Sequence, residues 1–139
     1  MNTVNLKSYR CTKLHFNNNL PPNKKIELSN KYSYNCGYMK GNICRGEFTV
    51  EITDKEKPEQ FSISVVMVGV FECSEGMAKE KLHVETFREM FPFVRSIVAN
   101  TTTNAGMPPV IIPMIDIEKQ EIYKVEMPRF RRPEEENKE

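Results

Sequence analysis

The chain has 139 residues, of which 39% are hydrophobic and 28% charged, with twenty Lys and Arg against nineteen Asp and Glu. This composition fits one globular domain, and the net charge of +1 argues against nucleic acid as a partner, because nucleic-acid-binding domains are usually clearly basic. No apolar run is long enough to cross a bilayer and the first ten residues lack a signal-like apolar block, so we expect a cytoplasmic protein without membrane insertion.

The cysteines and histidines predict neither a disulfide framework nor a metal centre. The four cysteines form no C-x-x-C pair, and the two histidines are not spaced as zinc ligands. We therefore expect reduced, mostly buried thiols, no metal and no cofactor. The cysteines are Cys11, Cys36, Cys44 and Cys73.

The first candidate strand, residues 8–16, alternates imperfectly. Leu14 and Phe16 share one face, whereas Tyr9 and Cys11 share the other, and this pattern supports a strand only moderately.

Residues 17–25 are rich in asparagine and proline and are expected to form a loop. A second, weaker strand is predicted within residues 26–39, where Tyr32 and Tyr34 lie on one side.

Residues 44–53 and 60–73 give clearer strand patterns and are expected to form an antiparallel hairpin. Both alternate between an apolar face and a polar face, as in a sheet with one buried side. The apolar face comprises Phe48, Val50, Ile52, Phe61, Ile63, Val65 and Met67. The other face becomes apolar at Val66, Val68 and Val70, so the far end of the hairpin is expected to be covered on both sides.

From Phe87 onward, apolar side chains recur at spacings of three and four, which predicts a helix. Pro92 interrupts this pattern because proline lacks the backbone donor and clashes with the preceding turn. We expect a short helical turn at 84–91, with Thr86 and Glu89 as a capping box, and a main helix that starts at Pro92. Gly106 is expected to end this helix as a C′ glycine.

Residues 107–117 are apolar and rich in proline, so they fit neither a helix interior nor a central strand. Asp116 is placed to cap a short final helix over 117–125, although the same residues also alternate tolerably as a strand. We expect residues 1–127 to form one domain and 128–139 a charged, disordered tail.

Catalytic signals are missing from the sequence. It contains no phosphate-binding glycine loop and no nucleophile elbow, and Cys11 and His15 lie about 13 Å apart along their strand, too far to touch. We therefore expect a protein that is not an enzyme. Its unusual feature is unpartnered apolar surface, which serves either an interface or a peptide groove, or else completes the monomer core.

One stretch resembles a known family. Residues 91–118, FPFVRSIVANTTTNAGMPPVIIPMIDIE, are similar to the carboxy-terminal pattern of the SecB export chaperones, in which F-P-[YF]-x-R opens the long helix and a proline-containing apolar segment follows it. CTKLHF at 11–16 resembles the first strand of that family and FSISVVMVGVFE at 61–72 its last. The resemblance covers roughly residues 8–125.

The resemblance implies an α+β fold, with a four-stranded antiparallel sheet packed on a long helix plus a short carboxy-terminal helix. It further implies a dimer of dimers, a homotetramer that holds unfolded or partly folded polypeptides in apolar grooves without ATP. Such grooves suit extended segments of little sequence constraint. Carried onto this chain, the groove residues are Leu20, Pro21, Pro22, Ile117, Ile122 and Val125, with Val110 and Ile112 as further candidates.

Two client classes follow from the resemblance: unfolded preproteins, or a single antitoxin as in the branch that serves toxin–antitoxin modules. Typical export members are acidic and bind the translocation ATPase through an acidic sheet face, whereas this chain is nearly neutral and has Arg45 beside Glu47 on that face. The ATPase is therefore an open question as a partner. A competing interpretation is a hotdog-like ligand-binding protein or enzyme that would rely on Glu89, Arg88 or His83.

Overall fold

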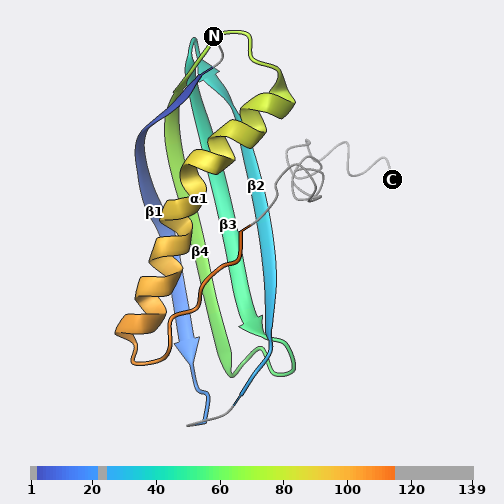
Figure 1. Cartoon of the computed structure of the whole chain (residues 1–139), viewed down its shortest axis with the longest axis vertical. Helices are drawn as coiled ribbons and strands as arrows, with labels where there is room; N and C mark the ends of the chain where they lie inside the picture. Colours follow the sequence, from blue (N-terminus) through green and yellow to red (C-terminus); the bar gives the residue numbers. More distant parts are fainter. Residues whose placement is uncertain (1–2, 22–24, 115–139) are drawn as a thin grey trace, which may run out of the picture.

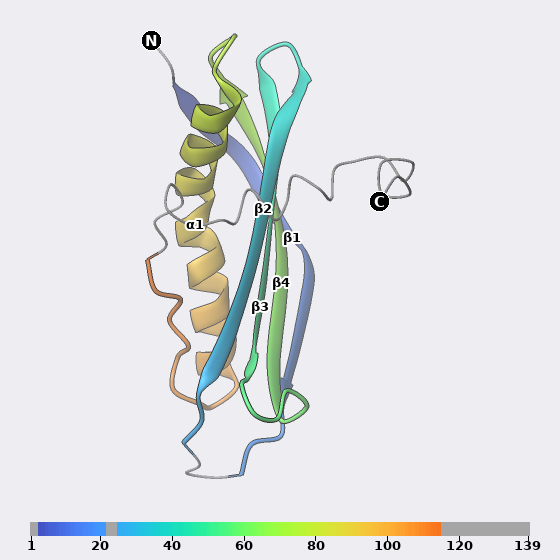
Figure 2. The same ribbon diagram turned by 90° about the vertical axis from the view of Figure 1, so that its right-hand side faces the viewer.

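The computed structural model describes residues 3–21 and 25–114, which form one sheet and one helix (Figure 1). The elements are β1 (Val4–Asn18), β2 (Leu28–Lys40), β3 (Ile43–Asp54), β4 (Phe61–Cys73) and α1 (Lys79–Asn104). The strands are antiparallel in the order β1-β4-β3-β2, and α1 crosses one face of the sheet (Figures 1 and 2). The predicted α+β architecture is confirmed for these residues, while the expected helix at 117–125 lies outside them.

The chain crosses from one sheet edge to the other between β1 and β2, beneath the ends of β3 and β4 (Figure 2). Backbone hydrogen bonds hold this crossover loop in place. The Asn19 N–H donates to the Gln60 carbonyl at 2.7 Å, and the Lys55 N–H donates to the Glu27 carbonyl at 2.8 Å. The loop therefore lies against the turn that joins β3 to β4, close to the carboxyl end of α1 (Figure 1).

The predicted alternation of β3 and β4 is confirmed. Their helix-facing side chains are buried completely or nearly so, and α1 adds a second apolar layer over them. The helix residues of this core include Leu82, Phe87, Met90, Phe91, Val94 and Val98.

Two irregularities in β1 correct the predicted faces of that strand. The register with β4 shifts between Leu6 and Ser8 and again between Cys11 and Lys13, so one extra residue is inserted at each place. Cys11 therefore pairs with Met67 on the helix-facing side, together with Leu14 and Phe16, whose partners are Val65 and Ile63. The prediction that Cys11 faces away from Leu14 was wrong, because strict alternation fails across a bulge.

Two glycines make room for side chains that pack over the helix-facing side of the sheet. Gly46 and Gly69 are direct partners in the β3–β4 register. A Cβ at Gly69 would lie 2.8 Å from the Met90 sulfur, and one at Gly46 would meet the Tyr34 hydroxyl. The Tyr34 hydroxyl in turn donates a buried 2.6 Å hydrogen bond to Thr86 in α1, which ties β2 to the helix.

The helix is continuous through Pro92, which corrects the predicted break. Pro92 is exposed, whereas Phe91 and Val94 beside it are buried on the sheet side. Burial of apolar side chains before and after the proline offsets the roughly 3 kcal/mol that an interior proline costs. The proposed capping box was also wrong, because Thr86 lies buried inside α1 and its hydroxyl donates to the Leu82 carbonyl at 2.8 Å.

Gly106 ends the helix as predicted. Its φ of 88° is a left-handed value that glycine adopts readily, and its N–H donates to the Thr103 carbonyl at 3.0 Å. The next residues turn back along α1 on the same side of the sheet (Figures 1 and 2). The Val110 N–H then donates to the Thr102 hydroxyl at 2.9 Å, which fixes the returning segment to the last helical turn.

The outer sheet face, opposite α1, carries no covering element within the described residues (Figure 2). The expected cover over the valines of β4 therefore stays a prediction. Val68 is nonetheless only 8% exposed, because it lies in the register between Glu47 of β3 and Arg10 of β1, whose long side chains flank it.

Candidate polypeptide-binding grooves

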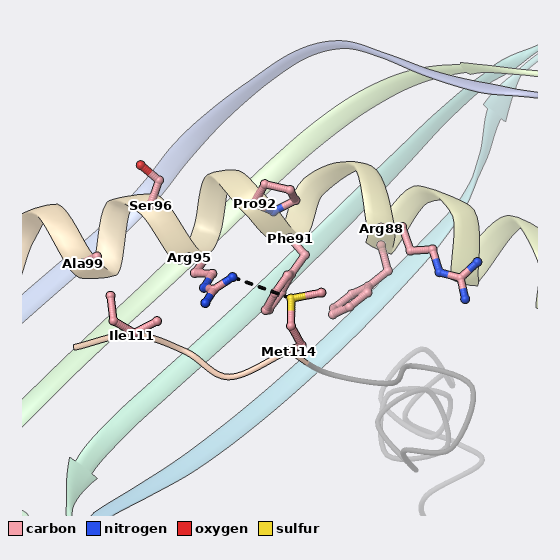
Figure 3. A pocket seen from close by; sticks show the side chains of 9 residues that line it. Arg88, Phe91, Pro92, Arg95, Ser96, Ala99, Ile111 and Met114 are labelled. Carbon is pink, nitrogen blue, oxygen red and sulfur yellow. Dashed lines mark hydrogen bonds between the residues drawn. The ribbon is translucent and has the colours of Figure 1, made fainter. Parts of the chain in front are cut away.

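Residues 106–114, the proline segment, form a wall of two separate grooves. The first, the crossover groove, is a cavity of about 700 Å³ between this segment and the crossover loop. The second, the arginine groove, measures about 570 Å³ and lies between the segment and α1 (Figure 3). Ile111 lines both grooves and is 51% exposed.

The side chains that line the crossover groove are apolar apart from the amide of Asn18, and backbone groups supply the remaining polar surface. Leu20 and Ile26 are half-buried against the core, and the fully buried ring of Phe61 closes the base. The amide of Asn18, which donates to the Met107 sulfur at 3.7 Å, joins the two walls at one end. The complete lining is Asn18, Leu20, Pro21, Ile26, Leu28, Phe61 and Gly106 through Ile111.

No charged side chain lines the crossover groove among the residues the structure describes. Pro21, Pro108 and Pro109 also offer no backbone N–H, so specific polar recognition has few donors here. Such a surface binds apolar side chains through burial and makes little demand on their order.

The arginine groove combines apolar walls with a cationic group. Phe91 of α1 points toward Met114 across the groove, and the Arg95 guanidinium donates to the Met114 sulfur at 3.6 Å (Figure 3). Arg88 lies at the rim nearer the helix N-terminus, with its guanidinium directed away from Met114 and 3.5 Å from the carboxylate of Glu85 (Figure 3).

The structure brings together three of the predicted groove residues, Leu20, Pro21 and Val110, from opposite ends of the chain. Ile112 is fully buried in the core and has no exposed surface to offer a ligand. The predicted residues Pro22, Ile117, Ile122 and Val125 lie outside the described residues.

Sequence reasoning missed Ile26 and Phe61 as groove residues, and also the groove that contains Arg95. Ile26 had only a weak strand pattern, and Phe61 reads as an ordinary core position. Only the crossover connection brings Ile26, Phe61 and Met107 to one cavity.

The polar residues of the competing enzyme interpretation do not converge. His83 is buried with its ring centroid 5.1 Å from that of Tyr34, whereas Arg88 and Glu89 are exposed. Arg88 lines the arginine groove, whereas His83 and Glu89 line neither of the two grooves.

The cysteines are free thiols, as predicted, and Cys36, Cys44 and Cys73 are buried. Burial raises the pKa of the Cys44 thiol to about 12, so this group stays protonated at neutral pH and is a poor nucleophile. Within the described ranges no three His, Cys, Asp or Glu side chains gather as metal ligands. In the same ranges no helix has the length and apolar character needed to span a membrane.

Comparison with known proteins identifies the family. The model of the family described as preprotein translocase subunit SecB matches residues 11–129. The chain belongs to the SecB family. The resemblance found in the sequence is thereby confirmed.

Curated relatives carry the name protein-export protein SecB. The protein from Anaplasma marginale (strain Florida) is 36% identical over 67 residues, which cover 45% of this chain and 38% of the relative. The protein from Rhodopseudomonas palustris (strain HaA2) is 31% identical over 84 residues, which cover 54% of this chain and 52% of the relative. The matched region thus spans between two fifths and about half of these relatives.

Solved structures share the SecB-like fold. A Mycobacterium tuberculosis SecB-like chaperone, in complex with a ChAD peptide from the HigA1 antitoxin, matches with a TM-score of 0.65 and 11% identity over 81% of this chain and 90% of that one. A Streptococcus agalactiae protein of unknown function matches with a TM-score of 0.52 and 12% identity over 82% and 99%. At such low identities the likeness shows the fold alone.

Proposed function

We propose that this SecB-family protein is a cytoplasmic holding chaperone that works without ATP and binds unfolded or partly folded polypeptides. The observation that carries the proposal is the crossover groove: an uncharged apolar cavity of about 700 Å³, open at the surface of a chain that belongs to the SecB family. Leu20, Pro21 and Val110 are the described client-contact residues, and Pro22, Ile117, Ile122 and Val125 extend the set beyond the described ranges.

Client binding in this groove relies on apolar burial. Each fully buried aliphatic side chain of a client contributes about 1.5–3 kcal/mol before entropic costs are subtracted. Pro108, Pro109 and Pro113 keep the wall extended, because proline enters neither a helix interior nor a central strand. The wall therefore keeps its apolar side chains available to a client instead of forming regular structure of its own.

The buried Ile112 supports this arrangement from behind. Its side chain anchors the proline segment in the core, while its neighbour Ile111 is exposed toward both grooves. We therefore assign Ile112 the role of holding the wall, and we place client contact on Val110 and Ile111.

Two classes of client agree with the comparisons. Curated relatives are named for protein export, which supports unfolded preproteins as clients. The similar Mycobacterium tuberculosis chaperone was solved with an antitoxin peptide, which supports a single dedicated antitoxin. The outer sheet face mixes Arg10, Lys31 and Arg45 with Glu47 and Glu51, so we assign no contact with the translocation ATPase to it.

Aggregation suppression tests the proposal. We expect the wild-type protein to suppress aggregation of heat-unfolded citrate synthase. Leu20→Asp or Val110→Asp should raise the chaperone concentration needed for half suppression about tenfold. Each variant loses an apolar contact with the client that is worth about 1.4 kcal/mol or more. Met39→Asp is the matched control, because Met39 is 60% exposed and lines neither groove. If the wild-type protein does not suppress aggregation, the proposed chaperone function is refuted. If Met39→Asp loses as much suppression as the groove variants, the assignment of client binding to the crossover groove is refuted.

Assembly and client identity need separate measurements. We propose a homotetramer, for which native mass spectrometry should give four copies of the 16.2 kDa chain, and a strict monomer would contradict it. Polypeptides that co-purify with the wild type but not with Leu20→Asp identify the client. One dominant small partner indicates an antitoxin, whereas a mixture of precursors with signal sequences indicates export.

A further inference from the structure

The two bulges of β1 bring its cations onto one face of the sheet. β1 carries Lys7, Arg10 and Lys13 and contains no Asp or Glu. On a regular strand, residues three apart point to opposite faces, so Arg10 would point away from the two lysines. Each bulge inserts one residue into β1 and thereby reverses the alternation once. All three cations therefore lie on the outer face, opposite α1.

The register with β4 confirms this alignment. Arg10 pairs with Val68 and Lys13 pairs with Val66, two valines of the outer face. Because the two pairs are one repeat apart on β4, the cations follow each other at roughly 6.7 Å, the spacing of alternate residues on an extended chain. We call the row formed by Lys7, Arg10 and Lys13 the basic ridge.

The charges of the basic ridge are available to a partner. Arg10 and Lys13 are exposed, and neither forms an ion pair with any residue that the structure describes. The Lys7 ammonium lies 3.9 Å from the Glu72 carboxylate, and both side chains are more than half exposed. Such an exposed pair contributes little, so a carboxylate of a partner can replace Glu72 at small cost.

The basic ridge is only one strand wide. Beyond the valines of β4, the outer face of β3 carries Glu47 and Glu51, and Arg45 is held 3.7 Å from Glu47. A nucleic-acid duplex is wider than a strand and would bring phosphates over these carboxylates, while the net charge of +1 attracts a polyanion only weakly. The charge pattern therefore fits a single extended polypeptide.

We propose that the basic ridge binds an extended acidic segment of a partner protein, with carboxylates at alternate positions paired to Lys7, Arg10 and Lys13. Each exposed pair is weak, so binding needs several carboxylates together and falls as salt screens them. The ridge and the two grooves lie on opposite faces of the sheet, so one protein can hold a client and this partner together (Figure 2). The proposal does not depend on the chaperone function.

Fluorescence anisotropy tests the ridge with a labelled peptide of repeated Glu-Thr, about twelve residues long, which spans β1 when extended. We expect the wild-type protein to bind it and to lose affinity at least about fivefold between about 0.02 M and 0.15 M salt. Arg10→Glu with Lys13→Glu should lower the affinity at least about tenfold at low salt, because attraction is replaced by repulsion. This double variant should instead bind a repeated Lys-Thr peptide, which also shows that it is folded.

Lys55→Glu with Lys57→Glu is the matched control. It changes the net charge by the same amount at two exposed lysines of the turn between β3 and β4, which line neither groove. An equal loss of affinity in this control would show that net charge, and not the ridge, attracts the peptide.

Two other results would overturn the proposal. A wild-type protein that does not bind the Glu-Thr peptide at low salt has no acidic-segment site. Tighter binding of a single-stranded oligonucleotide than of the peptide would assign the ridge to nucleic acid. Aggregation suppression by Arg10→Glu with Lys13→Glu should equal that of the wild type, and a loss would refute the separation of the ridge from client binding. A wild type without suppression would refute the chaperone function and leave the ridge standing.

Discussion

Replacing Ile112 by alanine separates the core role of the proline segment from its groove role. Ile112 is 0% exposed and Ile111 beside it is 51% exposed, so the two isoleucines form a matched pair. We expect Ile112→Ala to lower the free energy of unfolding strongly and Ile111→Ala to lower it weakly.

The expected magnitude follows from burial. The substitution removes three carbon groups from the core, each worth about 0.8 kcal/mol in transfer free energy, and the cavity left behind adds to this loss. We therefore expect Ile112→Ala to cost about 2–4 kcal/mol. Ile111→Ala should cost about 1 kcal/mol or less, because half of its side chain already contacts solvent.

Urea denaturation followed by circular dichroism, at one fixed protein concentration, measures both costs. For a chain of this length the loss in Ile112→Ala corresponds to a fall in melting temperature of about 10 °C. Aggregation suppression should show the reverse order when measured below the melting transition, with Ile111→Ala impaired more than Ile112→Ala. Equal stability losses in the two variants would refute the assignment of Ile112 to the core.

Three further predictions concern the core beneath the grooves. Tyr34→Phe should lower the free energy of unfolding by about 1 kcal/mol in urea titrations, because it removes the buried 2.6 Å hydrogen bond to the helix; an unchanged midpoint would contradict this. Gly69→Ala should cost about 1–3 kcal/mol by crowding Met90, whereas Gly37→Ala, which meets nothing within 4 Å, should cost less. Burial raises the pKa of the Cys44 thiol from its ordinary value of about 9 to about 12. The stability that the protonated thiol contributes is therefore fully present below about pH 9 and is lost as the pH rises toward 12. Cys44→Ala should therefore show a shallower decline in urea midpoint between pH 8 and pH 10, and an identical decline would contradict the pKa assignment.

The outcomes for Pro92 and Thr86 show where local rules fail. A proline inside a helix and a Thr-x-x-Glu pattern both predict a helix start, and within a short window nothing distinguishes that start from a helix interior. The helix continues because Phe91 and Val94 bury their side chains in the sheet, and Thr86 finds its partners in Tyr34 and the Leu82 carbonyl. These energies come from contacts that are distant in sequence or that form only once the helix is packed.

The bulges of β1 and the composition of the grooves were equally beyond local prediction. Where an extra residue enters β1 depends on its register with β4, which is more than 40 residues away. Leu20 and Val110 were expected to contact clients from their unpartnered apolar character and from family resemblance, and the crossover connection places them in one cavity.

The sequence by itself determined the features whose physical cause is local. The faces of β3 and β4 follow from the two-residue period of a strand, and the end of α1 follows from the left-handed conformation that Gly106 adopts. Tertiary structure alone decided which apolar residues became core and which became groove. Ile111 and Ile112 are chemically identical neighbours, and they differ only because the returning segment turns one side chain into the core and leaves the other exposed to both grooves.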